Sequence, residues 1–218
     1  MLRVAGQVDA AAASETAASI VDWRDPNDDV DVLTGGAEGS YYRALSEPYP
    51  CHNGDFQSLN ELLLVKGISR ELFWKIAPHL TLYGTGKVNL NAAGLTVLRI
   101  LAGASGGVLP GGDESVARKI VRYREAGNTF QEADAQAIVN SLNKFDSLTA
   151  AESGMLLGSG LMTFVTIRST YFGGIVEGIS GMAVERTGAS PAGARRLTRR
   201  ADFVVNAKTG SIVYWHEH

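Results

Sequence analysis

Side chains that carry oxygen are unusually dense near the start of the sequence. Asp, Asn and Glu residues that could bind a cation occur six times in ten positions and once more after a glycine pair: Asp22, Asp25, Asn27, Asp28, Asp29, Asp31 and Glu38. Carboxylates at this density repel one another unless they are solvated or neutralised by a cation. Calcium suits such a set, because it takes about six to eight oxygen ligands in a flexible geometry. The pattern favours an acidic, calcium-type loop over residues 22–42.

The same spacing also fits an acidic, solvated turn in which Asp25 or Asn27 caps the element that follows. The alternate acids and amides of residues 25–31 resemble the start of an EF-hand loop, but Pro26 interrupts them, and the central Gly and the closing Glu are missing. Spacing alone therefore leaves the cation site and the turn open. Glu38 and the aromatic pair that follows it, which would anchor the loop, favour the metal.

The composition describes a folded chain with an acidic first quarter. The 218 residues are 45% hydrophobic, enough to bury a core in one large domain or two small ones, and the net charge is −3. Residues 1–61 contain 11 acids and 3 bases, a net charge of −8, whereas the remainder contains 12 acids and 17 bases, a net charge of +5. The acidic quarter fits cation binding and argues against nucleic-acid contacts there.

Neither cysteine chemistry nor a membrane span is expected. Cys51 is the one cysteine of the chain, so no internal disulfide can form, and the adjacent His52 is poorly placed to act as its base. No run of about 18 apolar residues occurs, and the first residues match neither a signal peptide nor an anchor. We therefore expect the chain as given to be soluble.

A helix, glycine turn, helix unit is expected after the acidic loop. Ser58 and Glu61 form a capping box that opens a helix over residues 59–66, and Gly67 supplies a left-handed stop before a second helix over residues 70–77. The unit resembles a helix-hairpin-helix, the module that grips DNA phosphates in other proteins. Because the turn holds one basic residue, a structural use is favoured over DNA binding.

Further helices are expected over residues 10–21, 92–101, 114–126 and 131–142, the last two again as a hairpin pair. Four bases on helix 114–126 raise nucleic-acid binding as an option, which a solvated helix face explains as well. The glycine-rich connector 103–112 contains a Gly-x-Ser-x-Gly pattern, but it lacks the strand before and the helix directly after that a nucleophile elbow requires.

Strand patterns follow late in the sequence. Residues 163–171 alternate between apolar and polar side chains, residues 175–186 are rich in β-branched residues, and residues 203–206 and 211–215 complete an antiparallel set. A basic loop over residues 188–200 is expected between them. Helices first and strands last, without β-α-β alternation, indicate an α+β fold.

Six short motifs follow one another along the sequence. They are Asp22-Trp23-x-Asp25, Gly36-Ala37-Glu38-x-x-Tyr41-Tyr42, Pro48-Tyr49-Pro50, the Ser58-to-Gly67 capping-box segment, Asn89-x-Asn91 and Ile212-Val213-Tyr214-Trp215. Together they resemble the type II secretion system protein K family, the large minor pseudopilins. The resemblance runs from about residue 20 to the C-terminus.

The resemblance implies a helical domain with helix-hairpin-helix or SAM-like units over residues 1–150, followed by strands of a small antiparallel pilin-like β-sheet over residues 151–218. It implies a non-enzymatic minor pseudopilin at the tip of the periplasmic pseudopilus, which packs beside minor pseudopilins I and J. This tip complex would start or cap the fibre that exports folded proteins across the outer membrane. An N-terminal helix absent from this chain would anchor the whole protein in the bacterial inner membrane, and no nucleic acid would be bound.

Calcium (Ca2+) in the helical domain is also implied by the resemblance. The matching ligand positions are Asp25, Asn27, Asp28 and Glu38, although Pro26 and the extra residues before the glycine pair depart from the usual run of the family. Two other classes stay open: a helix-hairpin-helix DNA-binding protein and a calcium-dependent hydrolase. The acidic first quarter speaks against the first, and no nucleophile, base and orienting group converge in the sequence to support the second.

Overall fold

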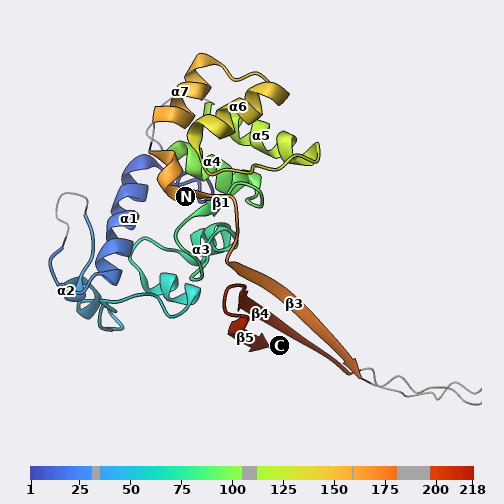
Figure 1. Ribbon diagram of the computed structural model, residues 1–218. Coiled ribbons are helices and arrows are strands. Elements are labelled where there is room, and N and C mark those ends of the chain that lie inside the picture. The colour runs from blue at the N-terminus through green and yellow to red at the C-terminus, as the bar shows by residue number, and fades with distance from the viewer. Residues whose placement is uncertain (31–34, 105–111, 159, 181–196) are drawn as a thin grey trace, which may run out of the picture. The chain divides into compact units, whose positions relative to one another are not determined.

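The chain divides into a mostly helical unit, residues 1–167, and a small sheet, residues 168–218 (Figure 1). The computed structural model describes residues 1–30, 35–104, 112–158, 160–180 and 197–218. The fold is mixed α+β, as the order of helical and strand patterns predicts. The domain division at residue 150 remains a prediction, because spatial compactness does not test which segments fold independently.

Helix α1 (Ala10–Arg24) opens the helical unit. Asp9 caps it, because one carboxylate oxygen accepts hydrogen bonds from the amides of Ala11 and Ala12, both at 3.0 Å. Alanine-rich sequence gives this segment its high helix propensity. Buried residues of α1 and of the segments before and after it share one apolar cluster: Leu2, Ala13, Trp23, Ala37, Tyr42, Leu62, Val65, Ile68, Leu72, Phe73 and Ile76.

The predicted helix, glycine turn, helix unit is present as η1 (Leu59–Leu64), α3 (Arg70–Ile76) and the short η2 (Ala77–His79). The capping box forms, with Glu61 accepting from the Ser58 amide at 2.8 Å. Its first helix is a 3-10 turn, because so short a segment offers few α-helical hydrogen bonds. Gly67 has φ +85°, and a Cβ there would lie 2.4 Å from the Thr16 hydroxyl.

Four helices build the second half of the helical unit: α4 (Leu95–Ala104), α5 (Gly112–Glu125), α6 (Ala135–Phe145) and α7 (Ala150–Gly158). They share a core of Leu90, Leu98, Leu101, Ala102, Val116, Ala117, Ile120, Phe130, Ile138, Val139, Leu142, Met155, Leu156 and Val165. The last helix predicted by the sequence starts later than residue 131, because Asp134 caps it by accepting from the Ala137 amide at 3.0 Å. The sequence patterns did not predict α7.

A buried ion pair joins α5 to α7. Lys119 Nζ lies 2.8 Å from Glu152 Oε2 and 2.7 Å from the carbonyl oxygen of Ser147. Glu152 also accepts from the Thr149 amide at 2.7 Å and from the Ser115 hydroxyl. Burial alone would raise the pKa of Glu152, but these hydrogen bonds lower it to about 2. Glu152 is therefore ionised at neutral pH, and both side chains of the pair have hydrogen-bond partners.

The predicted strand over residues 163–171 is mostly wrong, because only Val165, Thr166 and Tyr171 of this segment lie in strands. This segment forms η3 (Leu161–Phe164) and the two-residue strand β2 (Val165–Thr166), which pairs in parallel with β1 (Val88–Asn89) in the helical unit. Val165 is buried and Ile167 packs against the same helical core. The alternation in sequence thus reports burial against helices rather than membership of the sheet.

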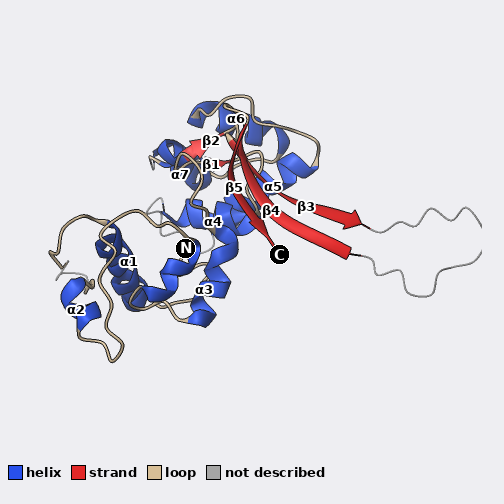
Figure 2. Ribbon diagram, turned by 90° about the horizontal axis from the view of Figure 1, so that it is seen from below, coloured by secondary structure: helices blue, strands red, loops and turns tan. Residues whose placement is uncertain are grey.

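The second unit is an antiparallel sheet in the order β3 (Tyr171–Ser180), β4 (Leu197–Asn206) and β5 (Ser211–Glu217). Figure 2 shows β4 between the other two strands. The basic loop predicted over residues 188–200 is partly wrong, because Arg199 and Arg200 lie in β4, while residues 181–196 lie outside the described stretches.

Large apolar side chains are exposed on both faces of this sheet. The strand register places Phe172, Val176 and Trp215 on one face and Ile175, Ile179 and Tyr214 on the other. Trp215 is 49% exposed and Phe172 is 51% exposed. Three strands with both faces open do not enclose a core of their own.

Candidate metal centre

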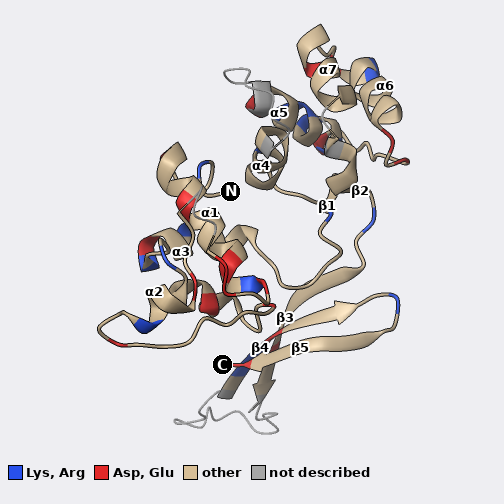
Figure 3. Cartoon of the chain, turned by 90° about the vertical axis from the view of Figure 1, so that its left-hand side faces the viewer, with Lys and Arg blue, Asp and Glu red and all other residues tan. Residues whose placement is uncertain are grey.

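Three carboxylates converge where α1 ends and α2 (Gly39–Arg43) begins. Asp22 lies in the last turn of α1, Asp25 is the residue that ends this helix, and Glu38 directly precedes α2. One ligand oxygen from each residue lies within 4.8 Å of the others. Asp22 is 2% exposed and Glu38 is 1% exposed. Figure 3 shows acidic residues on the part of the chain around α1 and α2.

Glu38 provides the strongest sign of a missing positive charge. Both of its carboxylate oxygens are buried and, among the described residues, neither has a hydrogen-bond donor in bonding geometry. Burial raises the pKa of Glu38, and the charges of Asp22, Asp25 and Asp28 raise it further. The backbone amide of Gly39, which lies outside bonding geometry, lowers this pKa but does not cancel the rise. A buried polar group without a partner is costly, so a hard cation bound to these oxygens would relieve both the burial and the repulsion.

Gly36 shapes the other side of this site. A Cβ at this position would lie 1.9 Å from Asp22 Oδ2 and 2.8 Å from Asp22 Cγ, well inside contact distance. The loop backbone therefore approaches the Asp22 carboxylate more closely than any residue with a side chain would permit. The glycine of the Gly-Ala-Glu motif keeps Asp22 and Glu38 together.

Aromatic contacts hold the ends of the two helices in place. Trp23 follows Asp22, and Tyr42 lies one helical turn after Glu38. Their rings meet edge to face with centroids 5.0 Å apart, and both side chains are buried. These anchors fix the spacing between the two parts of the chain that carry the carboxylates.

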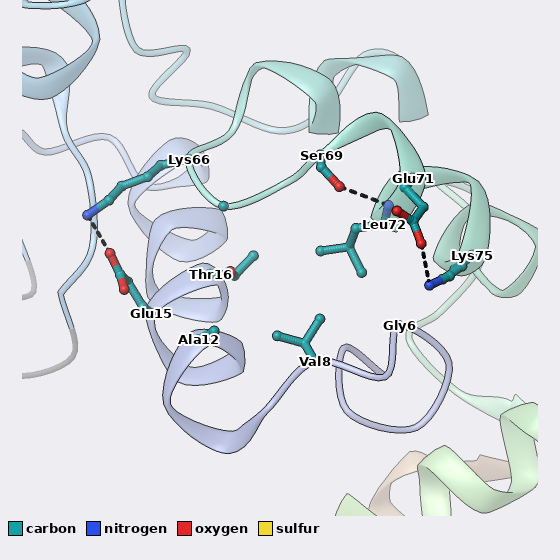
Figure 4. Close-up of a pocket in the computed structure, with 11 residues that line it drawn as sticks. Gly6, Val8, Ala12, Glu15, Thr16, Lys66, Ser69, Glu71, Leu72 and Lys75 are labelled. Carbon is teal, nitrogen blue, oxygen red and sulfur yellow. Dashed lines mark hydrogen bonds and ion pairs between the residues drawn. The ribbon is translucent and has the colours of Figure 1, made fainter.

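Lys66, in the turn before Gly67, tethers the glycine loop from the hairpin side. Its ammonium group lies 2.8 Å from Glu15 Oε1 and donates to the carbonyl oxygen of Gly35 at 3.1 Å. Figure 4 shows this ion pair at the edge of a hollow of about 420 Å³ between α1 and α3. The basic residue of the turn therefore has partners within the fold.

The structure brings together two of the four predicted ligands, Asp25 and Glu38, and adds Asp22. The other two lie in the adjoining turn. Asn27 Oδ1 accepts from the Asp29 amide at 2.6 Å, and Asn27 Nδ2 donates to Asp25 Oδ1 at 2.8 Å. Asp28 Oδ1 accepts from Asn53 Nδ2 at 3.3 Å. Ligation by Asn27 and Asp28 remains a prediction, and Asp31 lies outside the described stretches.

Sequence reasoning counted Asp22 among the oxygen donors but did not select it as a ligand. The signal was present, because the Asp-x-x-Asp spacing of residues 22 and 25 places both carboxylates on one side of a helix end. Asp22, Asp25 and Glu38 form a site that could hold a metal ion. An oxygen-only, acidic and mostly buried ligand set suits a hard divalent cation.

Fold and site together define a mixed α+β protein whose helical unit carries a candidate cation site. Comparison with known proteins narrows this class. Residues 2–85 match the protein-family model for "Type II secretion system (T2SS), protein K". The type II secretion system protein K of Aeromonas hydrophila is 36% identical over 73 residues, which cover 34% of this chain and 22% of that protein.

A solved structure extends the likeness along the whole chain. A chain in the crystal structure of the GspK–GspI–GspJ complex from the enterotoxigenic Escherichia coli type 2 secretion system matches with a TM-score of 0.61. The match covers 100% of this chain and 68% of that chain at 18% sequence identity, so it describes the fold alone. Residues 2–85 therefore resemble the type II secretion system protein K family in sequence, and the whole chain resembles a chain of that complex in fold.

Proposed function

We propose that this protein is a non-enzymatic minor pseudopilin that works at the tip of a type II secretion pseudopilus. The observation that carries the proposal is the fold match over the whole chain, which includes the helical unit and the strands, to a structure of the GspK–GspI–GspJ complex. On this proposal the protein joins minor pseudopilins of the I and J types and starts or caps the fibre that exports folded proteins.

The open faces of the second unit support an assembly role. We infer that β3, β4 and β5 belong to a larger pilin-like sheet, since Phe172, Trp215 and other large side chains lie exposed on both of its faces. Burial of such side chains is worth about 25 cal/mol per Å² of apolar surface, which favours further packing partners. The hairpin η1–α3 and the helix pairs α4–α5 and α6–α7 would be the helix-hairpin-helix or SAM-like units of the helical domain.

We propose calcium as the ion at Asp22, Asp25 and Glu38. Calcium accepts carboxylates in irregular geometry, whereas magnesium demands near-octahedral order and retains its waters. Asn27 and Asp28 would supply further oxygens after a rearrangement of the turn. The buried carboxylate oxygens of Glu38 have no hydrogen-bond donor among the described residues, and the bound ion would balance their negative charge.

The contacts of the basic residues oppose a nucleic-acid role. On α5, Arg118 pairs with Glu114, Arg122 pairs with Asp146, and Arg124 donates to backbone carbonyls of the segment before α4. DNA phosphates would have to replace these partners.

Chemistry by the lone thiol is equally disfavoured. Burial raises the pKa of Cys51 to about 11, so the thiol stays protonated at neutral pH, whereas the thiolate is the reactive form.

The periplasmic location and the inner-membrane anchor remain predictions from the family resemblance. Within the described stretches, every helix is too short or too polar to cross a lipid bilayer.

Reconstitution of the tip complex tests the proposal. We would mix the purified chain with the soluble parts of the I-type and J-type pseudopilins from the same source and measure mass by size-exclusion chromatography with light scattering. The proposal expects one species that contains all three chains, formed at micromolar concentration in the presence of calcium. Three separate peaks at that concentration would refute it, and binding to duplex DNA that weakens steeply with salt would support the helix-hairpin-helix alternative instead.

A further inference from the structure

Two histidines and an aspartate share one face of the sheet in the second unit. His216 on β5 lies directly opposite Asp202 on β4 in the antiparallel register. The amide of His218 donates to the carbonyl oxygen of Arg200 at 2.9 Å, which extends the ladder by one more residue. Since side chains alternate along a strand, His216, His218 and Asp202 point to the same side.

The side chains of this trio already interact. His218 Nε2 lies 2.9 Å from Asp202 Oδ2, and the rings of His216 and His218 are 4.7 Å apart, centroid to centroid, at 87°. Asp202 Oδ1 is shielded from solvent and, among the described residues, has no hydrogen-bond partner. The Asp202 carboxylate therefore has its Oδ2 beside the imidazole of His218 and its Oδ1 available to bind a cation.

We propose that His216, His218 and Asp202 form a second metal site, which takes a transition-metal dication such as Zn2+. Imidazole and carboxylate are the usual ligands of zinc, at about 2.0–2.2 Å, and two such ligands on a tetrahedral ion lie about 3.4 Å apart. The present 2.9 Å between His218 and Asp202 is close to that spacing. His216 does not yet bring a ring nitrogen within 4.8 Å of both other ligands. Rotation of its exposed side chain would complete the set, and the fourth position is left to water or to a partner.

This site differs in chemistry from the acidic site in the helical unit. The acidic site offers oxygens alone, which suit calcium, whereas nitrogen ligands select zinc, nickel or copper. The sequence alone does not pair these residues, because Asp202 is 14 residues from His216 and only the strand register brings the two opposite each other. Strand pairing of this kind is not encoded in local spacing.

The charges around the site are balanced. Arg200 lies on the same face, opposite His218, and would repel a cation, but Glu177 on β3 lies directly opposite Arg200. The other face of the sheet carries the stacked rings of Phe203 and Trp215, with centroids 6.3 Å apart. Tyr214 lies on the histidine face, where its ring stacks near that of His216 with centroids 6.5 Å apart.

Titration of the chain with zinc chloride tests the inference. The protein would carry no histidine tag, and calcium would be in excess so that the acidic site is filled. Calorimetry should give one zinc ion per chain, with a dissociation constant that rises about tenfold or more in His216→Ala, in His218→Ala and in Asp202→Asn, because removal of even outer-sphere partners costs about 10–100-fold. His79→Gln, which changes a histidine in the helical unit, serves as the matched control and should bind zinc like the wild type.

Histidine proton signals in NMR provide a second measurement that does not depend on affinity. Zinc should shift the ring signals of His216 and His218 and leave those of His52 and His79 in place. Zinc binding that survives both histidine substitutions, or that is lost in His52→Gln instead, would overturn the inference. Absence of saturable zinc binding by the wild-type chain would overturn it equally.

Discussion

Replacement of Glu38 by Gln separates two effects that a cation site should show: repulsion among its carboxylates without calcium, and stabilisation of the fold by bound calcium. The substitution keeps the shape of a buried side chain but removes one negative charge from the group formed with Asp22 and Asp25. Two unit charges 4.8 Å apart, the limit of the observed separations, repel by about 3 kcal/mol at an effective dielectric constant of about 20. Solvent at the half-buried Asp25 and the raised pKa of Glu38 both reduce this figure.

Without calcium, the variant should therefore be the more stable protein. We expect Glu38→Gln to raise the free energy of unfolding by about 1–2 kcal/mol in chelator, which corresponds to about 2–8 °C in melting temperature for a unit of this size. In calcium at about 100 times its dissociation constant, the wild type should gain about 2.7 kcal/mol. The variant lacks one ligand and should gain much less, so the order of the two melting temperatures should reverse.

Differential scanning calorimetry at neutral pH, in chelator and across a calcium titration, measures the melting temperatures of the wild type and the variant. Glu47→Gln is the matched control, since Glu47 is an exposed acid in the same part of the chain; it should leave the calcium response unchanged. Equal destabilisation by Glu38→Gln with and without calcium would mean that Glu38 has a packing role alone. Failure of the wild type to respond to calcium would remove the calcium assignment altogether.

Three further expectations concern the acidic site around Glu38 and the buried pair of Lys119 and Glu152. Gly36→Ala should weaken calcium binding by about tenfold or more in calorimetry, because its Cβ would lie 1.9 Å from Asp22 Oδ2, whereas Gly154→Ala, where the added Cβ meets nothing within 4 Å, should leave binding unchanged. Lys119→Met should lower stability in urea by about 3–5 kcal/mol, since it leaves the buried Glu152 without its partner; an effect below about 1 kcal/mol would contradict that reasoning. The pH dependence should also differ. The pKa of Glu38 is raised in the folded state. The stability that its protonated form contributes is therefore present at low pH and is lost as pH rises through the folded pKa, so the advantage of Glu38→Gln in chelator should shrink as pH falls. The pKa of Glu152 is lowered to about 2, so its contribution is present above the unfolded value of about 4.3 and is lost as pH falls through about 2, a dependence that Glu152→Gln should remove.

Local signals in the sequence predicted the parts of the fold that depend on local chemistry. The capping box of Ser58 and Glu61 and the left-handed Gly67 are both present, because each is decided by neighbours within a few residues. The helix over the alanine-rich segment follows from intrinsic propensity in the same way. Of these elements, the helix bears directly on the site, because Asp22 lies in its last turn and Asp25 ends it.

Tertiary contacts decided the parts that the sequence did not predict. The alternating residues 163–171 have the period of a strand, yet Val165 is buried among helices and pairs with Val88, which is 77 residues away. Period reports which side chains are buried and not what they are buried against. Helix α7 was missed because its short, glycine-containing sequence has a weak pattern, and the buried pair of Lys119 with Glu152 is a contact that no local rule contains.

The candidate site shows the same division. The density of acids marked the loop, but the approach of this loop to Asp22 depends on Gly36, whose missing side chain lets the backbone come close to the end of α1. That loop is held on its other side by Lys66, which binds the carbonyl oxygen of Gly35 and the carboxylate of Glu15. Gly67 also packs against Thr16 of α1. The hairpin turn, the glycine loop and helix α1 therefore each contact the other two. A cation bound to Glu38, Asp22 and Asp25 would stabilise the hairpin as well as the loop. Calcium should therefore protect the backbone amides of both segments from hydrogen exchange. Protection confined to the loop would show that the contacts do not couple the stability of the two segments.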